Sequence, residues 1–154
     1  MSASVTKLAS VRPKEFHFPV AVDWAGGRRV SARVEGKSPV EIAPPVVFSG
    51  TDASAWSPED FFVAAAASCL AVTFTGIAER AGFEFDGLSV AADGVCGMRP
   101  DGHFGFTGLT LRLELETRAD RERALELAER AEESCLVAAS LDVPIETQIV
   151  VHGG

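Results

Sequence analysis

The sequence has few of the residues that would indicate a metal site or a nucleic-acid surface. It contains three cysteines and three histidines in 154 residues, and 14 Lys and Arg against 22 Asp and Glu, a net charge of −8. The histidines, His17, His103 and His152, are isolated, and no pair has metal-ligand spacing. No cluster of Lys and Arg is present to displace counterions from nucleic acid or anionic lipid. We therefore expect no bound metal, no nucleic-acid partner and no membrane partner.

Other absences concern the organisation of the chain. We find no internal repeat, no low-complexity tract, and no basic start followed by an apolar core of the kind that marks a secretion signal. These absences predict a single cytoplasmic domain over residues 1–154, with residues 1–14 as a loose N-terminal arm. Residues 61–78 carry no charge, but they are rich in alanine and near the lower length limit for a membrane span. That composition favours a central helix covered by protein.

Turn residues and apolar patterns predict an α+β domain. A first helix should begin at Ser57-Pro58-Glu59-Asp60, because serine caps free amides, proline suits the first helical position and carboxylates favour the positive end of the helix dipole. It should run to about residue 81 and end at Gly82. A second helix is expected from about Asp120 to Ser134. The expected strands cover residues 15–24, 29–35, 40–48, 88–96, 104–116 and 145–151.

Two of the three cysteines lie on apolar helical stripes. Cys69 shares a stripe of the first helix with residues at three- and four-residue steps, and Cys135 lies at the end of the second helix on a similar stripe. Spacing permits the two stripes to pack together. The alternative is that both are inert, since free cysteine often acts as a small buried hydrophobe. Cys96 has no CxxC partner and is interpreted as a packing residue.

A reactive Cys69 requires help from its surroundings. The thiolate is the nucleophile, and apolar burial raises the pKa of a thiol. Cys69 is about three turns into its helix, too far for the dipole of that helix to favour the thiolate strongly. We therefore expect a cation from elsewhere, and the available candidates are Arg28, Arg29 and Arg33.

Each of the two cysteines stands in a longer motif. Residues 57–70 read SPEDFFVAAAASCL, and residues 128–141 read AERAEESCLVAASL. Both resemble the cysteine motifs of the OsmC/Ohr family, and the predicted hairpin and last strand fall where that family has them. The resemblance covers roughly residues 20–152.

The resemblance implies antiparallel sheets packed around two central cysteine-bearing helices, in an intertwined homodimer with active sites at the subunit interface. Cys69 matches the peroxidatic cysteine and Cys135 the resolving one. Glu59 matches the glutamate that orients a catalytic arginine, which would be Arg29 or, less favoured, Arg28. Glu59 and Cys69 are ten residues apart, or about 15 Å along a helix. A site that combines Glu59 of one subunit with Cys69 of the other would bring both to one arginine.

The implied activity is a thiol-dependent peroxidase that protects against oxidative stress. Cys69 would become a sulfenic acid, form a disulfide with Cys135, and be restored by an external dithiol of the lipoyl type, with no bound cofactor. Apolar walls would favour organic hydroperoxides. The candidate wall residues are Phe61, Phe62, Leu70, Phe74 and Val137. The alternatives are a dimer of the same fold that binds a small apolar ligand without redox turnover, and an interaction protein with inert cysteines.

Overall fold

The computed structural model describes residues 14–153, and these form two compact units that divide between Ile42 and Ala43. Together they contain strands and helices as an α+β chain does, which confirms the predicted class. The single-domain expectation stays a prediction. The expected N-terminal arm falls almost wholly on residues 1–13, which lie outside the described part.

The first unit is a three-stranded antiparallel sheet. Its strands are β1 (Ala21–Gly26), β2 (Arg29–Arg33) and β3 (Val40–Ile42), in the order β1-β2-β3. The β1–β2 turn uses two glycines with positive φ angles, Gly26 at 101° and Gly27 at 57°. Glycine adopts such angles without steric cost, so the sequence Gly-Gly fixes this turn.

All three strands are shorter than predicted, and β2 ends at Arg33 rather than at residue 35. Strand β1 begins at Ala21 rather than at residue 15, because Ala21 pairs with Arg33, where β2 ends. Strand β3 ends at Ile42 rather than at residue 48. Pro44 and Pro45 follow, and proline has no amide hydrogen to donate to a neighbouring strand. The chain forms a short 3-10 helix, η1 (Val46–Phe48), instead.

The second unit is built around α1 (Pro58–Ala81), which begins and ends as predicted. The Ser57 hydroxyl accepts from the Asp60 amide, and the Asp60 carboxylate accepts from the Ser57 amide, a reciprocal capping box. At the other end Gly82 takes the left-handed conformation, with φ 61°. Local sequence alone accounts for both ends of this helix.

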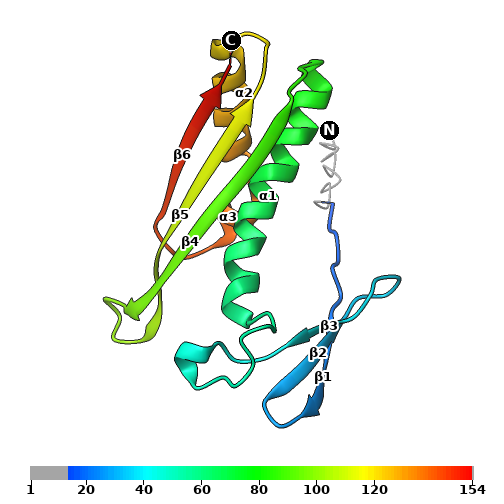
Figure 1. Cartoon of the computed structure of the whole chain (residues 1–154), viewed down its shortest axis with the longest axis vertical. Helices are drawn as coiled ribbons and strands as arrows, with labels where there is room; N and C mark the ends of the chain where they lie inside the picture. The colour runs from blue at the N-terminus through cyan, green and yellow to red at the C-terminus, as the bar shows by residue number, and fades with distance from the viewer. Residues whose placement is uncertain (1–13, 154) are drawn as a thin grey trace, which may run out of the picture. The chain divides into compact units, whose positions relative to one another are not determined.

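The second unit also contains a mixed sheet in the order β4-β5-β6 (Figure 1). Strands β4 (Gly87–Met98) and β5 (Phe104–Glu116) form the predicted antiparallel hairpin, whereas β6 (Ile145–His152) runs parallel to β5. The expectation of antiparallel pairing throughout was therefore wrong for β6. Parallel neighbours need a crossover connection, and here α2 (Arg121–Glu133) and α3 (Leu136–Ser140) supply it.

The core of this unit lies between the sheet and its helices. Alternate residues of β5 point to one face and are at most 2% exposed, as the two-residue period of a strand requires. They pack against Leu70 and Phe74 of α1 and the alanine-rich side of α2. In Figure 1 the helices lie on one side of the three strands. The buried residues of β5 are Leu109, Leu111, Leu113 and Leu115.

Within the described residues, α1 is long and apolar enough to cross a membrane. Central helices of soluble proteins meet the same criterion. Five of its residues are buried in the core and the others are partly buried or exposed, so the expected cover by protein is incomplete in this unit.

Candidate redox site

Cys69 lies in the middle of α1, at the border between its buried and its open face. The next residue, Leu70, is 1% exposed and points into the core, whereas Cys69 is only partly buried. The thiol is therefore held by a well-packed helix without being enclosed by it. Thr73, one turn further on, places its hydroxyl oxygen 3.9 Å from the Cys69 sulfur.

Cys135 lies at a helix junction rather than inside a helix. Helix α2 ends at Glu133, and Cys135 has extended backbone angles and is the N-cap of α3. The expectation of two cysteine-bearing helices therefore holds for Cys69 and not for Cys135. The Cys135 side chain is 2% exposed and belongs to the core.

The structure brings Cys69 and Cys135 together, a contact that the spacing of the two apolar stripes permitted. Both thiols are free, and the Cys135 thiol acts as a hydrogen-bond donor to the Cys69 sulfur. This contact is the central feature of the site, because two cysteines must approach each other closely before they can form a disulfide.

Burial and hydrogen bonds act on Cys69 in opposite directions. Burial is the largest single influence and raises the pKa, but the hydrogen bonds together outweigh it, so the pKa of the Cys69 thiol lies below its ordinary value. A buried thiolate is favoured when donors replace the water it has lost. The donors are the backbone amides of Val137 and Leu136, the Cys135 thiol and the Thr73 hydroxyl.

The opposite holds for Cys135. Burial, followed by the hydrogen bond and the negative charge of Cys69, raises the pKa of the Cys135 thiol above its ordinary value. When the pair loses one proton, Cys69 is therefore the thiol that gives it up. In such a pair, one thiol is suited to attack as a thiolate and its neighbour is the one that keeps its proton.

The sequence did not identify the groups that favour the thiolate. We expected a cation to be needed, whereas the donors in this unit are neutral: Thr73 and the first amides of α3. Thr73 had a usable signal, since it stands four residues after Cys69 on the same side of the helix. Backbone amides have no side-chain signature, and a five-residue helix has too short a pattern to predict.

A second feature of this unit is a cavity beside Glu59. One space of about 850 Å³ and another of about 340 Å³ are both lined by Glu59, Cys96 and Phe106. The Glu59 Oε2 atom is buried and has no hydrogen-bond partner among the described residues. Burial and the charge of Glu59 raise the pKa of the Cys96 thiol. Cys96 thus lacks the activation that Cys69 has.

The predicted apolar wall residues lie in three different places. Leu70 and Phe74 are at most 1% exposed and pack in the core, so they have no free surface for a substrate. Phe61 and Phe62 are partly buried near Glu59, where Phe62 stacks on Phe106 with ring centroids 4.2 Å apart. Val137 is partly buried, and its amide is bonded to Cys69.

The candidate arginines belong to the first unit. Arg29 lies 3.5 Å from Glu41 across the β2–β3 pair, and Arg33 pairs with Asp23 across the β1–β2 pair. That Arg29 or, less favoured, Arg28 acts at the cysteines stays a prediction. In the described part of the chain no group of three or more His, Cys, Asp or Glu side chains is placed to hold a metal ion.

Comparison with known proteins defines the family. The sequence model of the OsmC-like proteins matches residues 50–150, about two thirds of the chain. This chain belongs to the OsmC-like protein family. The matched residues all lie in the second unit and include both Cys69 and Cys135.

Individual relatives agree with this assignment. The uncharacterized protein YmaD of Bacillus subtilis is 24% identical over 88% of this chain and 93% of that protein. The structure of an OsmC-like protein of unknown function from Vibrio cholerae superposes with a TM-score of 0.80 at 19% identity, covering 88% of this chain and all of the other. The organic hydroperoxide resistance protein OhrB of Bacillus subtilis gives 0.64 at 25% identity, covering 87% and 98%. The fold is therefore that of the OsmC/Ohr proteins.

Proposed function

We propose that this chain is a thiol-dependent peroxidase that reduces organic hydroperoxides and protects the cytoplasm against oxidative stress. The observation that supports this proposal most is the Cys69–Cys135 pair, in which one thiol has a lowered pKa and the other a raised one. Membership of a family that includes organic hydroperoxide resistance proteins agrees with it.

The first step is attack by the Cys69 thiolate on a peroxide oxygen. The S–O bond forms as the O–O bond breaks, and the sulfur is oxidised by two electrons to a sulfenic acid. The leaving alkoxide takes a proton and departs as an alcohol. The donors around Cys69 favour the thiolate, which is the form that attacks.

The second step joins the two cysteines. The Cys135 sulfur attacks the Cys69 sulfenic acid, a disulfide forms and water leaves. Because the two thiols already hydrogen-bond, this step can precede further oxidation of Cys69. An external dithiol of the lipoyl type then reduces the disulfide by exchange, and both thiols are restored. No bound cofactor is required.

Exposed apolar residues support assembly into a homodimer. Side chains at alternate positions from residue 16 to residue 24, before and within β1, are 58% to 88% exposed. Alternate residues of an extended chain share one face, and folded monomers rarely leave so large an apolar face uncovered. A second copy of the chain would cover it. The five residues are Phe16, Phe18, Val20, Val22 and Trp24.

The buried, unpartnered oxygen of Glu59 supports a role for an arginine. A buried carboxylate oxygen without a donor is costly. We propose that the guanidinium of Arg29, or of Arg28, supplies that donor and adds positive charge to the site. The dimer would place Glu59 of one subunit and Cys69 of the other at the same arginine. Phe61 and Phe62 are the wall residues we propose to face an apolar peroxide.

Steady-state peroxide consumption tests the proposed function. With cumene hydroperoxide and excess dihydrolipoamide, the native protein should consume many equivalents of peroxide per subunit, and Cys69→Ser should consume none above background. Cys96→Ser is the matched control and should retain activity, since the Cys96 thiol has a raised pKa and no disulfide partner. Equal rates for the native protein and Cys69→Ser would contradict the proposal.

A further inference from the structure

The amides that favour the Cys69 thiolate come from a short segment that is held at its two ends. Helix α3 has five residues, Leu136–Ser140, and begins directly after Cys135. At its start the buried Cys135 side chain holds the segment in the core. At its end the chain leaves through residues 141–144 before it enters β6 at Ile145. The position of α3 at Cys69 therefore depends on how both of its ends are held.

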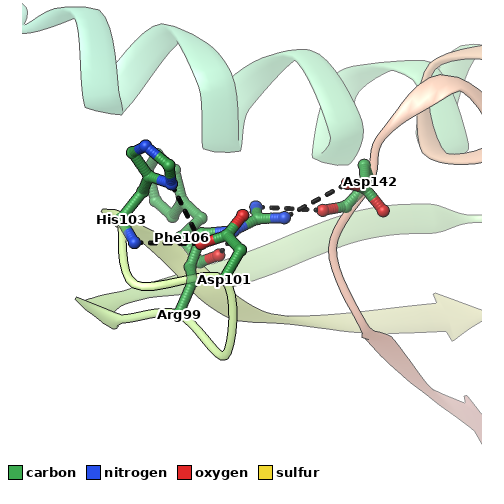
Figure 2. A network of polar contacts seen from close by, with 5 residues as sticks. All are labelled: Arg99, Asp101, His103, Phe106 and Asp142. Carbon is green, nitrogen blue, oxygen red and sulfur yellow. Dashed lines mark hydrogen bonds and ion pairs between the residues drawn. The ribbon is translucent and has the colours of Figure 1, made fainter.

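Arg99 binds the segment that follows α3. It lies just beyond β4, at the start of the hairpin turn, and its Nη1 donates to the backbone oxygen of Asp142 at 3.2 Å. Its Nη2 donates to the Asp142 carboxylate at 3.1 Å. Figure 2 shows the guanidinium reaching from the hairpin to Asp142, 43 positions later in the chain. Two donors on one planar group fix the orientation of the residue that they bind.

The same guanidinium is fixed from the hairpin side. Nη1 also donates to the Phe106 carbonyl at 3.5 Å, and Nε lies 3.5 Å from the Asp101 carboxylate. Asp101 in turn accepts from the His103 amide at 3.0 Å. A Cβ atom on Gly105 would lie 3.2 Å from the Arg99 Cδ, so the arginine stem passes directly over that glycine. Arg99 thus joins both sides of the β4–β5 hairpin to the chain after α3.

Stability alone does not account for this arrangement. The Asp142 side chain is fully exposed, and ion pairs of that kind contribute little to stability. What the contacts define is geometry. Asp142 is two residues beyond the end of α3, so a hold on Asp142 limits how far α3 can move from α1.

We propose that Arg99 is a positioning residue that holds α3, and with it Cys135 and the amides of Leu136 and Val137, against Cys69. The inference rests on the proposed function, in which Cys69 is the attacking thiol. Arg99 touches neither cysteine and acts through Asp142. Without it, α3 moves away, the Cys69 thiolate loses donors, and the sulfenic acid waits longer for Cys135.

The pH dependence of Cys69 alkylation tests this proposal directly. The full-length reduced protein is treated with iodoacetamide between pH 5 and 10, and modification of the Cys69 peptide is followed by mass spectrometry. The titratable group bonded to Cys69 is Cys135, while Arg99 faces Asp101 and Asp142, with His103 beside Asp101. Arg99→Gln should move the midpoint to higher pH and slow alkylation at pH 7 by about threefold to tenfold, since below the midpoint one pKa unit is about tenfold in thiolate.

Arg112→Gln is the matched control. Arg112 pairs with Glu114 within β5 rather than with the chain that follows α3, so the Cys69 midpoint of this variant should equal that of the native protein. If Arg99→Gln does not fold, as judged by circular dichroism, Arg99→Lys is used instead. Lysine keeps the positive charge and the aliphatic part of the side chain but cannot make the bidentate contact with Asp142. The midpoint of Cys69 alkylation should therefore still rise.

A folded Arg99 variant whose Cys69 profile superimposes on the native profile overturns the proposal. A lower melting temperature with an unchanged midpoint does so as well, because it assigns Arg99 a purely structural role. The experiment needs no peroxide. A raised midpoint in a protein that fails to consume peroxide would therefore support the role of Arg99 while refuting the proposed function.

Discussion

The two cysteines of the candidate site differ in what surrounds them. Cys69 receives hydrogen bonds from α3 and Thr73 that lower its pKa, and Cys135 is buried beside the resulting negative charge. A single bond, from the Cys135 thiol to Cys69, connects the two effects. Cys135 is therefore expected to act before the disulfide forms, as a donor to the thiolate.

Substituting Cys135 tests this role. Cys135→Ala removes a donor from the Cys69 thiolate, so the Cys69 pKa should rise and alkylation should require higher pH. Cys69 is an acid with a lowered pKa, so its reactivity appears as pH rises through that pKa and the loss of a donor moves the onset upward. Cys135→Ser keeps a hydroxyl donor and should shift less. Identical profiles for the native protein and Cys135→Ala would contradict the account.

At the scale of elements, α1 packs closely on β4. A Cβ atom on Gly94 would lie 2.6 Å from Val63 and 2.7 Å from Phe106, distances that no side chain can keep without a shift. Glycine at this position therefore permits the approach of the helix to the sheet. The approach also shapes the cavity at Glu59, because Gly94, Val63 and Phe106 all line it.

Gly94→Ala should force α1 and β4 apart and lower the free energy of unfolding by about 1–3 kcal/mol, the usual cost of overpacking. Gly97→Ala, three residues later in β4, is the control. A Cβ atom there would meet nothing closer than 3.6 Å, so little change is expected. Urea titrations of both variants measure the difference. Equal free energies of unfolding for the two variants would contradict this prediction, because they would show that α1 can move away from β4 without cost.

The elements differ in how far the sequence could predict them. Helix α1 was predictable because its signals are local: the Ser57–Asp60 box, Pro58 and Gly82. The direction of β6 was not, because it depends on the crossover through α2 and α3 and leaves no mark within the strand. The predicted strand over residues 15–24 begins too early, because apolar alternation shows which face of a segment is apolar but not where its partner strand ends.

The candidate site, like the elements, was predictable only in part. Helical spacing and the family motifs singled out both cysteines, and the spacing permitted their approach without requiring it. The α3 amides that donate to Cys69 could not be predicted, since they are backbone groups of a helix too short to show a period. Two of the five predicted wall residues, Leu70 and Phe74, are core, because an apolar stripe looks the same whether it faces a substrate or the sheet.

At the scale of the whole molecule, the apolar face around β1 predicts a dimer. Light scattering should give a mass of about twice the 16.3 kDa of one chain. Replacing Phe18 and Val22 by serine removes two exposed apolar side chains from that face and should shift the equilibrium toward monomer. Glu35→Ser, an exposed polar position in the same unit, should leave the mass unchanged. A native protein that is monomeric and fully active would contradict the shared site.

The central claim is that Cys69 and Cys135 form a two-cysteine peroxidase, and intact mass after peroxide tests it most directly. One equivalent of cumene hydroperoxide is added to the reduced native protein, Cys69→Ser and Cys135→Ser, and each is measured under denaturing conditions. The account predicts rapid loss of two hydrogen atoms in the native protein, an oxygen-bearing Cys69 in Cys135→Ser and no reaction in Cys69→Ser. A native protein that stays fully reduced would contradict it and favour the non-redox, ligand-binding alternative.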